Sequence, residues 1–165
     1  MAMVSMPKRL PKKYDLLGLK TLNLDHNHEV LATLVSCLLN SSPNLVDLRI
    51  IEDFGLFFEW KPGHPLPLAA EVWEEQINAR CVEKHLSSVT YYIGSLFEGH
   101  PGGLCQFLVM NARVLKRMNI QYRRLRVKPE HAAMVEAVRS ELHRWPRASP
   151  DVVLELSPVD RYLRF

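Results

Sequence analysis

The sequence has little that points to a membrane, a disulfide framework or export. No apolar run approaches the roughly 18 residues that a membrane-spanning helix needs, and the basic residues 1–15 contain no apolar core of signal-peptide length. The three cysteines lie far apart and form no CxxC pair, which fits free thiols in a reducing compartment. We therefore expect a protein of the cytoplasm or nucleus, with no membrane partner.

Signatures of catalysis are also scarce. The chain contains no G-x-S-x-G, HExxH or Walker sequence. His26 and His28 have no third ligand at a recognisable spacing, so a loop and helix cap explains them better than a metal site. The stretch from Gly99 to Gly103 precedes an expected helix, where a phosphate can bind, but Pro101 removes a donor amide and a turn is favoured. We predict no enzyme activity, no cofactor and no metal.

Two other candidate groups also favour structural roles. Cys105 lies on the apolar side of an expected helix and is predicted to pack as a small hydrophobe, with His100 as its only nearby base. Asp47, Glu52 and Asp53 form an acidic spot at a strand end, where a solvated edge is expected because no acid–base partner is evident.

Length and composition indicate one globular domain. A chain of 165 residues with 47% hydrophobic and 24% charged residues can bury about two-thirds of its unfolded surface and does not have the composition of a disordered protein. The net charge is +3, and much of the positive charge lies between Arg113 and Lys128. Such a cluster can contact the phosphates of a nucleic acid, but a solvated helix end and loop is favoured.

A recurring apolar pattern organises the chain. Segments with apolar residues at positions one, four and six begin at residues 19, 45, 86 and 115, and a looser version covers residues 152–156. The spacings between aligned segments are 26, 41, 29 and 36 residues. Helix-period segments lie between strands, at Glu29 to Asn40, Leu104 to Leu115 and Pro129 to His143. We predict an α/β fold, a short leucine-rich-repeat-like solenoid with parallel strands; an open α/β sheet of another topology is the alternative.

Alternation within the strands assigns each side chain to a face. The predicted core set is Leu22, Leu24, Leu48, Ile50, Val89, Tyr91, Met118 and Ile120. The positions between them are expected to be exposed and to bind a partner protein: Asn23, Asp47, Arg49, Thr90, Tyr92 and Asn119. Of these, Arg49 and Tyr92 are of the residue types most often found as binding hot spots. A register shift of one residue would exchange the two sets.

Residues 52–84 interrupt the pattern with an aromatic and proline-rich stretch. A short helix is expected from Ala69 to Ile77. Long irregular segments inside compact domains are often functional, but the aromatic residues here can also cover a strand end or extend the core, and this second interpretation is slightly favoured. The predicted organisation is a polar leader (1–15), a repeat-like segment (16–51), this excursion (52–84), a C-terminal α/β unit (85–158) and a tail (159–165).

Three motifs follow one another between Trp73 and Ile120. Trp73 is followed by Cys81, by Leu86-Ser-Ser-Val89, and by the block Asn111-Ala-Arg-Val-Leu-Lys-Arg-Met-Asn-Ile120. In this order they resemble the FBD domain of plant F-box proteins, and the segments 19–24 and 45–50 look like the leucine-rich repeats that precede it. The resemblance covers roughly residues 16–158. It departs from the family in the neutral turn at 99–103 and in lacking a proline before Cys81.

The resemblance implies a protein-interaction module like the substrate-recognition region of a ubiquitin-ligase F-box protein. No segment resembles the F-box itself, so we expect the chain to correspond to the C-terminal part of such a protein and not to bind the Skp-type adaptor. The alternatives are salt-sensitive nucleic-acid binding through the 113–128 cluster, and an inactive truncated remnant whose first repeat lacks a cap.

Overall fold

A computed structural model describes residues 9–11, 16–18, 20–26, 31–52, 70–78, 80–92, 103–123 and 132–160. For residues 22–26, 31, 32, 52 and 81 only the backbone is described. All statements below concern these parts of the chain.

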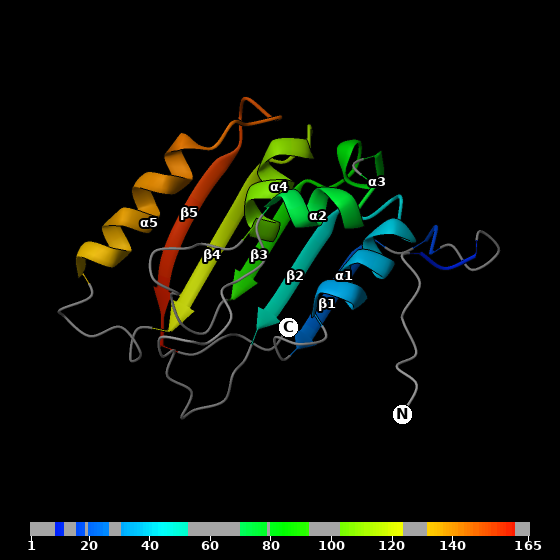
Figure 1. Ribbon diagram of the computed structural model, residues 1–165, viewed down its shortest axis with the longest axis horizontal. Helices are drawn as coiled ribbons and strands as arrows, with labels where there is room; N and C mark the ends of the chain where they lie inside the picture. Colours follow the sequence, from blue (N-terminus) through cyan, green and yellow to red (C-terminus); the bar gives the residue numbers. More distant parts are fainter. Residues whose placement is uncertain are drawn as a thin grey trace.

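Strands and helices alternate, and the strands form one parallel sheet (Figure 1). The sheet has five strands in the order β1-β2-β3-β4-β5, and all four pairings are parallel. The strands are β1 Thr21–His26, β2 Asp47–Glu52, β3 Ser88–Tyr92, β4 Arg117–Arg123 and β5 Val153–Val159. The helices are α1 Leu31–Asn40, α2 Ala70–Gln76, α3 Arg80–Glu83, α4 Gly103–Asn111 and α5 Ala132–Arg144. The predicted α/β class with parallel strands is confirmed.

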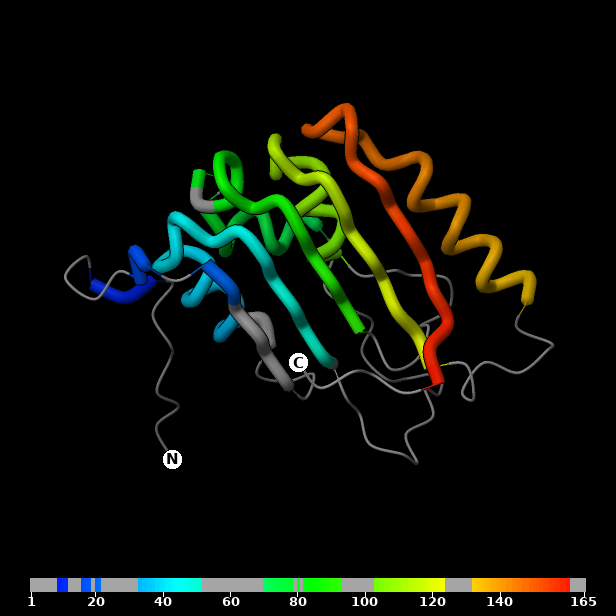
Figure 2. The backbone as a smooth tube through the Cα atoms, turned by 180° about the vertical axis from the view of Figure 1, so that it is seen from behind, coloured from blue at the N-terminus to red at the C-terminus, as the bar shows by residue number. Residues whose placement is uncertain are grey.

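The helices cover one face of the sheet and leave the other without a helix. In Figure 1 the helices α1, α2 and α4 lie in front of the strands and α5 lies beside β5, and the view from behind in Figure 2 shows the strands in front. A parallel arrangement requires the chain to return after each strand, and here it always returns on the same side. The fold is therefore a two-layer one, with a sheet face that no described helix covers.

The strand register agrees with the spacing of the apolar pattern. Leu22 pairs with Leu48, Leu48 with Val89, Val89 with Met118, and Met118 with Leu154. These pairs reproduce the predicted spacings of 26, 41, 29 and 36 residues. Apolar side chains of neighbouring strands thus share one layer, and this layer is the one that the helices cover.

The residue directly before each of four strands accepts backbone hydrogen bonds from the start of the neighbouring strand. The carbonyl of Lys20 accepts hydrogen bonds from the amides of Val46 and Asp47, both at 2.9 Å. The carbonyl of Val46 serves β3 in the same way, that of Ser87 serves β4, and that of Lys116 accepts from Val153. We call this end of the sheet, where the strands begin, the entry end.

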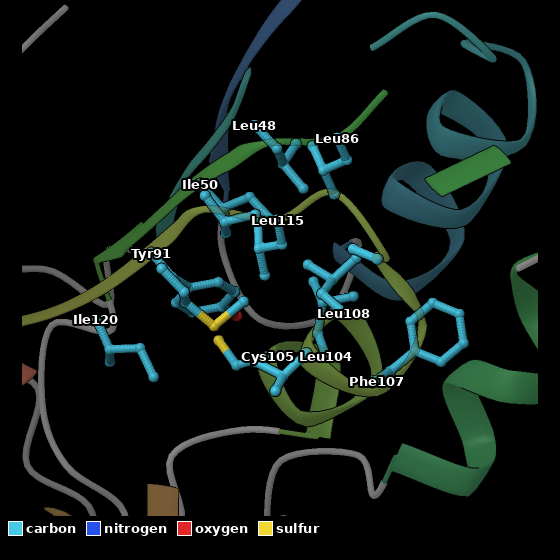
Figure 3. Close-up of a cluster of buried hydrophobic side chains, with 14 of the residues drawn as sticks. Leu48, Ile50, Leu86, Tyr91, Leu104, Cys105, Phe107, Leu108, Leu115 and Ile120 are labelled. Carbon is cyan, nitrogen blue, oxygen red and sulfur yellow. The ribbon is translucent and has the colours of Figure 1, made fainter. Parts of the chain in front are cut away.

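The core lies between the sheet and the helices. Val89, Met118 and Ile120 are at most 1% exposed, and so are Phe107 and Leu108 of α4. Figure 3 shows the side chains of α4 facing those of β2 and β3, with Leu86 and Leu115 from the strand entries beside them. Cys105 belongs to this core, as its position on the apolar side of α4 predicts. The six described members of the predicted core set are all buried; the side chains of Leu22 and Leu24 lie outside the described part.

One helix prediction needs correction, and one helix was not predicted. The helix predicted over 104–115 ends at Asn111, because the chain turns there: the Leu115 amide bonds to the Ala112 carbonyl at 3.4 Å, and the Asn111 side chain donates back to the Phe107 carbonyl at 2.8 Å. Leu115 is apolar because it enters the core from the turn, not from the helix. The four-residue helix α3 is too short to produce a periodic pattern.

Candidate binding surface on the open sheet face

The open face, the side of the sheet opposite the helices, is a grid of mostly polar side chains. Successive strand residues point to opposite faces, so the positions between the core residues lie here. The strand pairings align them in rows. One row contains Asn23, Arg49, Thr90, Asn119 and Glu155, and the preceding row contains Thr21, Asp47, Ser88, Arg117 and Val153.

Four of the residues that the sequence predicts as partner contacts lie close together in these two rows. Asp47, Arg49, Thr90 and Asn119 are half-buried, neither inside the core nor fully exposed. Parallel sheets are commonly covered on both faces and then have continuous apolar strands. Here polar side chains alternate with the core residues, so this face is suited to water or to a polar partner. The side chain of Asn23 lies outside the described part of the chain.

Side-chain hydrogen bonds pre-order the open face. Arg49 Nε donates to Asp47 Oδ2 at 2.8 Å within β2, and Arg117 Nη2 donates to Glu155 Oε2 at 3.0 Å across β4 and β5. Ser157 Oγ donates to Asn119 Oδ1 at 3.1 Å. The Arg117–Glu155 side chains remain 61% and 38% exposed, so this pair is available to a partner. A surface with these bonds already formed loses less side-chain freedom on binding.

Tyr92 does not belong to the accessible surface, and its predicted role as an exposed hot spot is wrong. Its side chain is only 3% exposed, although it lies on the open face and outside the contiguous core. Tyr92 pairs in register with Ile51, which is 8% exposed. Apolar neighbours paired on adjacent strands contact each other, and both of these residues are buried. Alternation assigns Tyr92 to a face correctly, but it does not determine whether that face is accessible there.

The open face also contains polar strand residues that the sequence analysis did not name as contacts. Ser88, Arg117, Gln121 and Glu155 occupy its rows beside the predicted contacts. The signal for Glu155 was present, because the spacing of 36 residues aligns it with Asn119. The looser apolar pattern of residues 152–156 concealed this alignment.

The basic cluster of residues 113–128 does not form one patch in the described part of the chain. Arg113 and Lys116 lie in the connection between α4 and β4, whereas Arg123 is the last residue of β4. Lys116 and Arg123 are seven residues apart along an extended strand, which corresponds to about 23 Å. Arg117 is engaged by Glu155. The residues from Arg124 to Lys128 lie outside the described part.

The remaining candidates give no chemical site among the described residues. No group of three or more His, Cys, Asp and Glu side chains there is placed to hold a metal ion. Asp47 of the acidic spot pairs with Arg49; the side chain of Glu52, Asp53, His28, His100 and the turn before Gly103 lie outside the described part. Residues 52–84 contain α2 and α3, and Trp73 is buried in the core, which fits a cover for this end of the fold.

Searches for known relatives add no further constraint. No protein-family model, no curated protein and no solved structure matches the chain. None of the described helices has the length and apolar character required to cross a lipid bilayer.

Proposed function

We propose that this chain is a protein-interaction module, a leucine-rich-repeat-like solenoid that binds another protein through the open face of its sheet. The observation that carries this proposal is the row of half-buried polar side chains Arg49, Thr90, Asn119 and Glu155. Solenoids with strands stacked in chain order commonly bind partners through their sheet surface. The resemblance to the FBD region of F-box proteins supports a role like substrate recognition in ubiquitin ligation.

The accessible part of the proposed interface is polar. The accessible rows are those nearer the entry end, because Ile51 and Tyr92 are buried in the next row. A partner that matches this part needs hydrogen-bonding groups. It also needs a carboxylate to face the arginines and a guanidinium or ammonium group to face the carboxylates of the pairs Arg49–Asp47 and Arg117–Glu155. Such polar matching provides specificity more than raw affinity.

Affinity capture with paired variants tests this function. Thr90→Arg and Asn119→Arg each place a long charged side chain in the centre of the open face, and Glu74→Arg places one on the exposed surface of α2. We expect proteins captured from a plant extract by the wild type to be retained by Glu74→Arg and lost by the two face variants. A partner retained equally by all four proteins would contradict binding through this face.

The same experiment tests the ligase connection. Purified Skp-type adaptor is added to immobilised wild-type chain in parallel. We expect no adaptor binding, because no segment of the sequence resembles an F-box. Retention of the adaptor would overturn this part of the proposal and restore the complete adaptor role.

A further inference from the structure

A row of exposed cations lies along the entry end of the sheet. The connections that lead from helices to strands cover residues 41–46, 84–87, 112–116 and 145–152, and Lys20 precedes β1. These segments contain a single carboxylate, Asp151, and five Lys and Arg residues, all of them exposed. We define the basic rim by these five residues: Lys20, Lys84, Arg113, Lys116 and Arg147.

The fold places these cations at one end of the sheet, before the starts of β1, β3, β4 and β5, and the connection that leads to β2 contains none. Lys20 and Lys116 occupy equivalent positions directly before β1 and β4, as their carbonyl bonds to the next strand show. Lys84 lies before β3, and Arg147 lies before β5. Neighbouring strands are about 4.8 Å apart, so the rim is about 19 Å long. The strand starts lie along the upper side of the sheet in Figure 1.

The charges of the rim are not used internally. Within the described part of the chain, no ion pair involves Lys20, Lys84, Arg113 or Lys116. Arg147 Nη1 donates a hydrogen bond to the Val152 carbonyl at 3.2 Å, but the Arg147 side chain carries no ion pair with a described residue, and Arg147 is exposed. Cations can complement the carbonyl ends of helices, and this accounts for Lys84 and Arg113, which follow α3 and α4. It does not account for Lys20 or Lys116, which are next to strands.

We propose that the basic rim binds an acidic segment of another protein in an extended conformation. Along an extended segment, alternate side chains on one side are about 6.7 Å apart, so about six residues with three carboxylates match the length of the rim. Unpaired cations in a row attract such a segment and guide its approach. This surface is separate from the open face, and the proposal does not depend on the function assigned to that face.

Two observations favour an acidic protein segment over a nucleic acid. Single-stranded nucleic acids are usually bound by exposed aromatic side chains on which bases stack. In the part of the chain that the structure describes, the aromatic residues are all buried: Trp73, Tyr91, Tyr92, Phe107, Tyr122 and Trp145. A protein that contacts about 6–10 phosphates of a duplex needs several cations for them, and the rim offers five.

Fluorescence anisotropy of the whole chain with a labelled synthetic peptide of alternating glutamate and serine tests the proposal. The peptide has about six glutamates, and titrations are made at about 50 and 200 mM salt. We expect Lys116→Gln to weaken binding about two- to fivefold, and Asp151→Asn, which removes the rim's carboxylate, to strengthen it about twofold. Replacing Lys20, Lys84, Arg113 and Lys116 together by Gln is expected to abolish binding.

Arg123→Gln is the control, because Arg123 is the last residue of β4 and Lys116 lies directly before the first residue of this strand. It makes the same change in net charge outside the rim and should leave the affinity within about twofold of the wild type. Equal weakening by Lys116→Gln and Arg123→Gln would overturn the proposal, because net charge alone would then explain binding. The proposal would also be overturned if a labelled DNA duplex or single strand bound more tightly than the peptide, or if the peptide did not bind at low salt. Circular dichroism checks that each variant is folded.

Discussion

Arg139 of α5 donates a hydrogen bond from Nη1 to the carbonyl oxygen of Leu156 in β5, at 3.3 Å. In a parallel ladder alternate residues bond to one side. The amide of Val153 bonds towards β4, so the backbone groups of Leu154, Leu156 and Pro158 point to the outer edge of the sheet. Pro158 has no amide hydrogen, and Arg139 covers a free carbonyl. The outer edge of β5 is thereby protected against pairing with another strand.

Removing this protection should cause self-association. In the variant Arg139→Ala/Pro158→Val, the Leu156 carbonyl is uncovered and an amide donor is restored at position 158. We expect the apparent mass measured by size-exclusion chromatography with light scattering to rise with protein concentration. Glu136→Ala is the control, because it removes the 3.4 Å ion pair with Arg139 but leaves the covered carbonyl. An edge variant with the mass of the wild type at every concentration would refute the protective role.

Asn40 should contribute more to stability than its counterpart at the end of α4. Its Nδ2 donates to the Gln76 carbonyl at 2.8 Å and its Oδ1 accepts from the Asn78 amide at 2.7 Å, which joins α1 to the end of α2. Asn40→Ala leaves both backbone groups without these partners and should lower the free energy of unfolding by about 2–3 kcal/mol. The measurement is urea denaturation followed by circular dichroism.

Asn111→Ala is the matched comparison for Asn40. Asn111 bonds only within its own helix, to the Phe107 carbonyl, and its loss should lower the free energy of unfolding by less than about 1 kcal/mol. An equal decrease in the free energy of unfolding for the two variants would show that the hydrogen bonds from α1 to the end of α2 do not contribute more to stability than the bond within α4.

Leu108 should be among the most costly core positions. It is fully buried in α4 between the helix layer and the sheet. Leu108→Ala should lower the free energy of unfolding by about 2–5 kcal/mol, because it removes buried apolar surface and leaves a cavity. Val114→Ala, at a site 40% exposed, should change it by less than about 0.5 kcal/mol. Guanidinium denaturation measures both, and a small loss for Leu108→Ala would mean that the core is loosely packed there.

Buried thiols should react slowly in the native protein. Cys37 and Cys105 are 2% and 0% exposed, and a thiol reagent must reach a thiolate to react. In a Cys81→Ser variant, we expect a chromogenic disulfide reagent to label almost no thiol in the folded chain and both remaining thiols after denaturation. Rapid labelling of both in the absence of denaturant would show that the core opens readily.

The sequence predicts the register of the strands better than it predicts which side chains on the sheet surface are accessible. The spacing of Leu22, Leu48, Val89 and Met118 predicts the strand register, because burial of one face imposes a strict period of two on each strand. The same argument correctly assigns Arg49, Thr90 and Asn119 to the opposite face. It also assigns Tyr92 to that face, but it does not predict that Tyr92 is buried there, because accessibility depends on neighbours such as Ile51 that only the pairing of strands brings together.

Features that depend on contacts distant in the sequence could not be predicted. The bond from Arg139 to Leu156 and the bonds of Asn40 to the chain near residue 77 involve single side chains without any repeating pattern. The basic rim is similar, since its residues come from three connections and Lys20, and they lie together at one end of the sheet only once the strands are aligned. The 113–128 cluster is contiguous in the sequence, but β4 separates its described ends.

The register also has a consequence for how this chain can change over time. Aligned residues of neighbouring strands are separated by 26, 41, 29 and 36 residues, yet every strand begins at the same level of the sheet. Differences in length are therefore absorbed between the strands, and an insertion in one connection leaves the phase of the next strand unchanged. Each unit is free to lengthen or shorten by itself, so new loops can be acquired without redesigning the core.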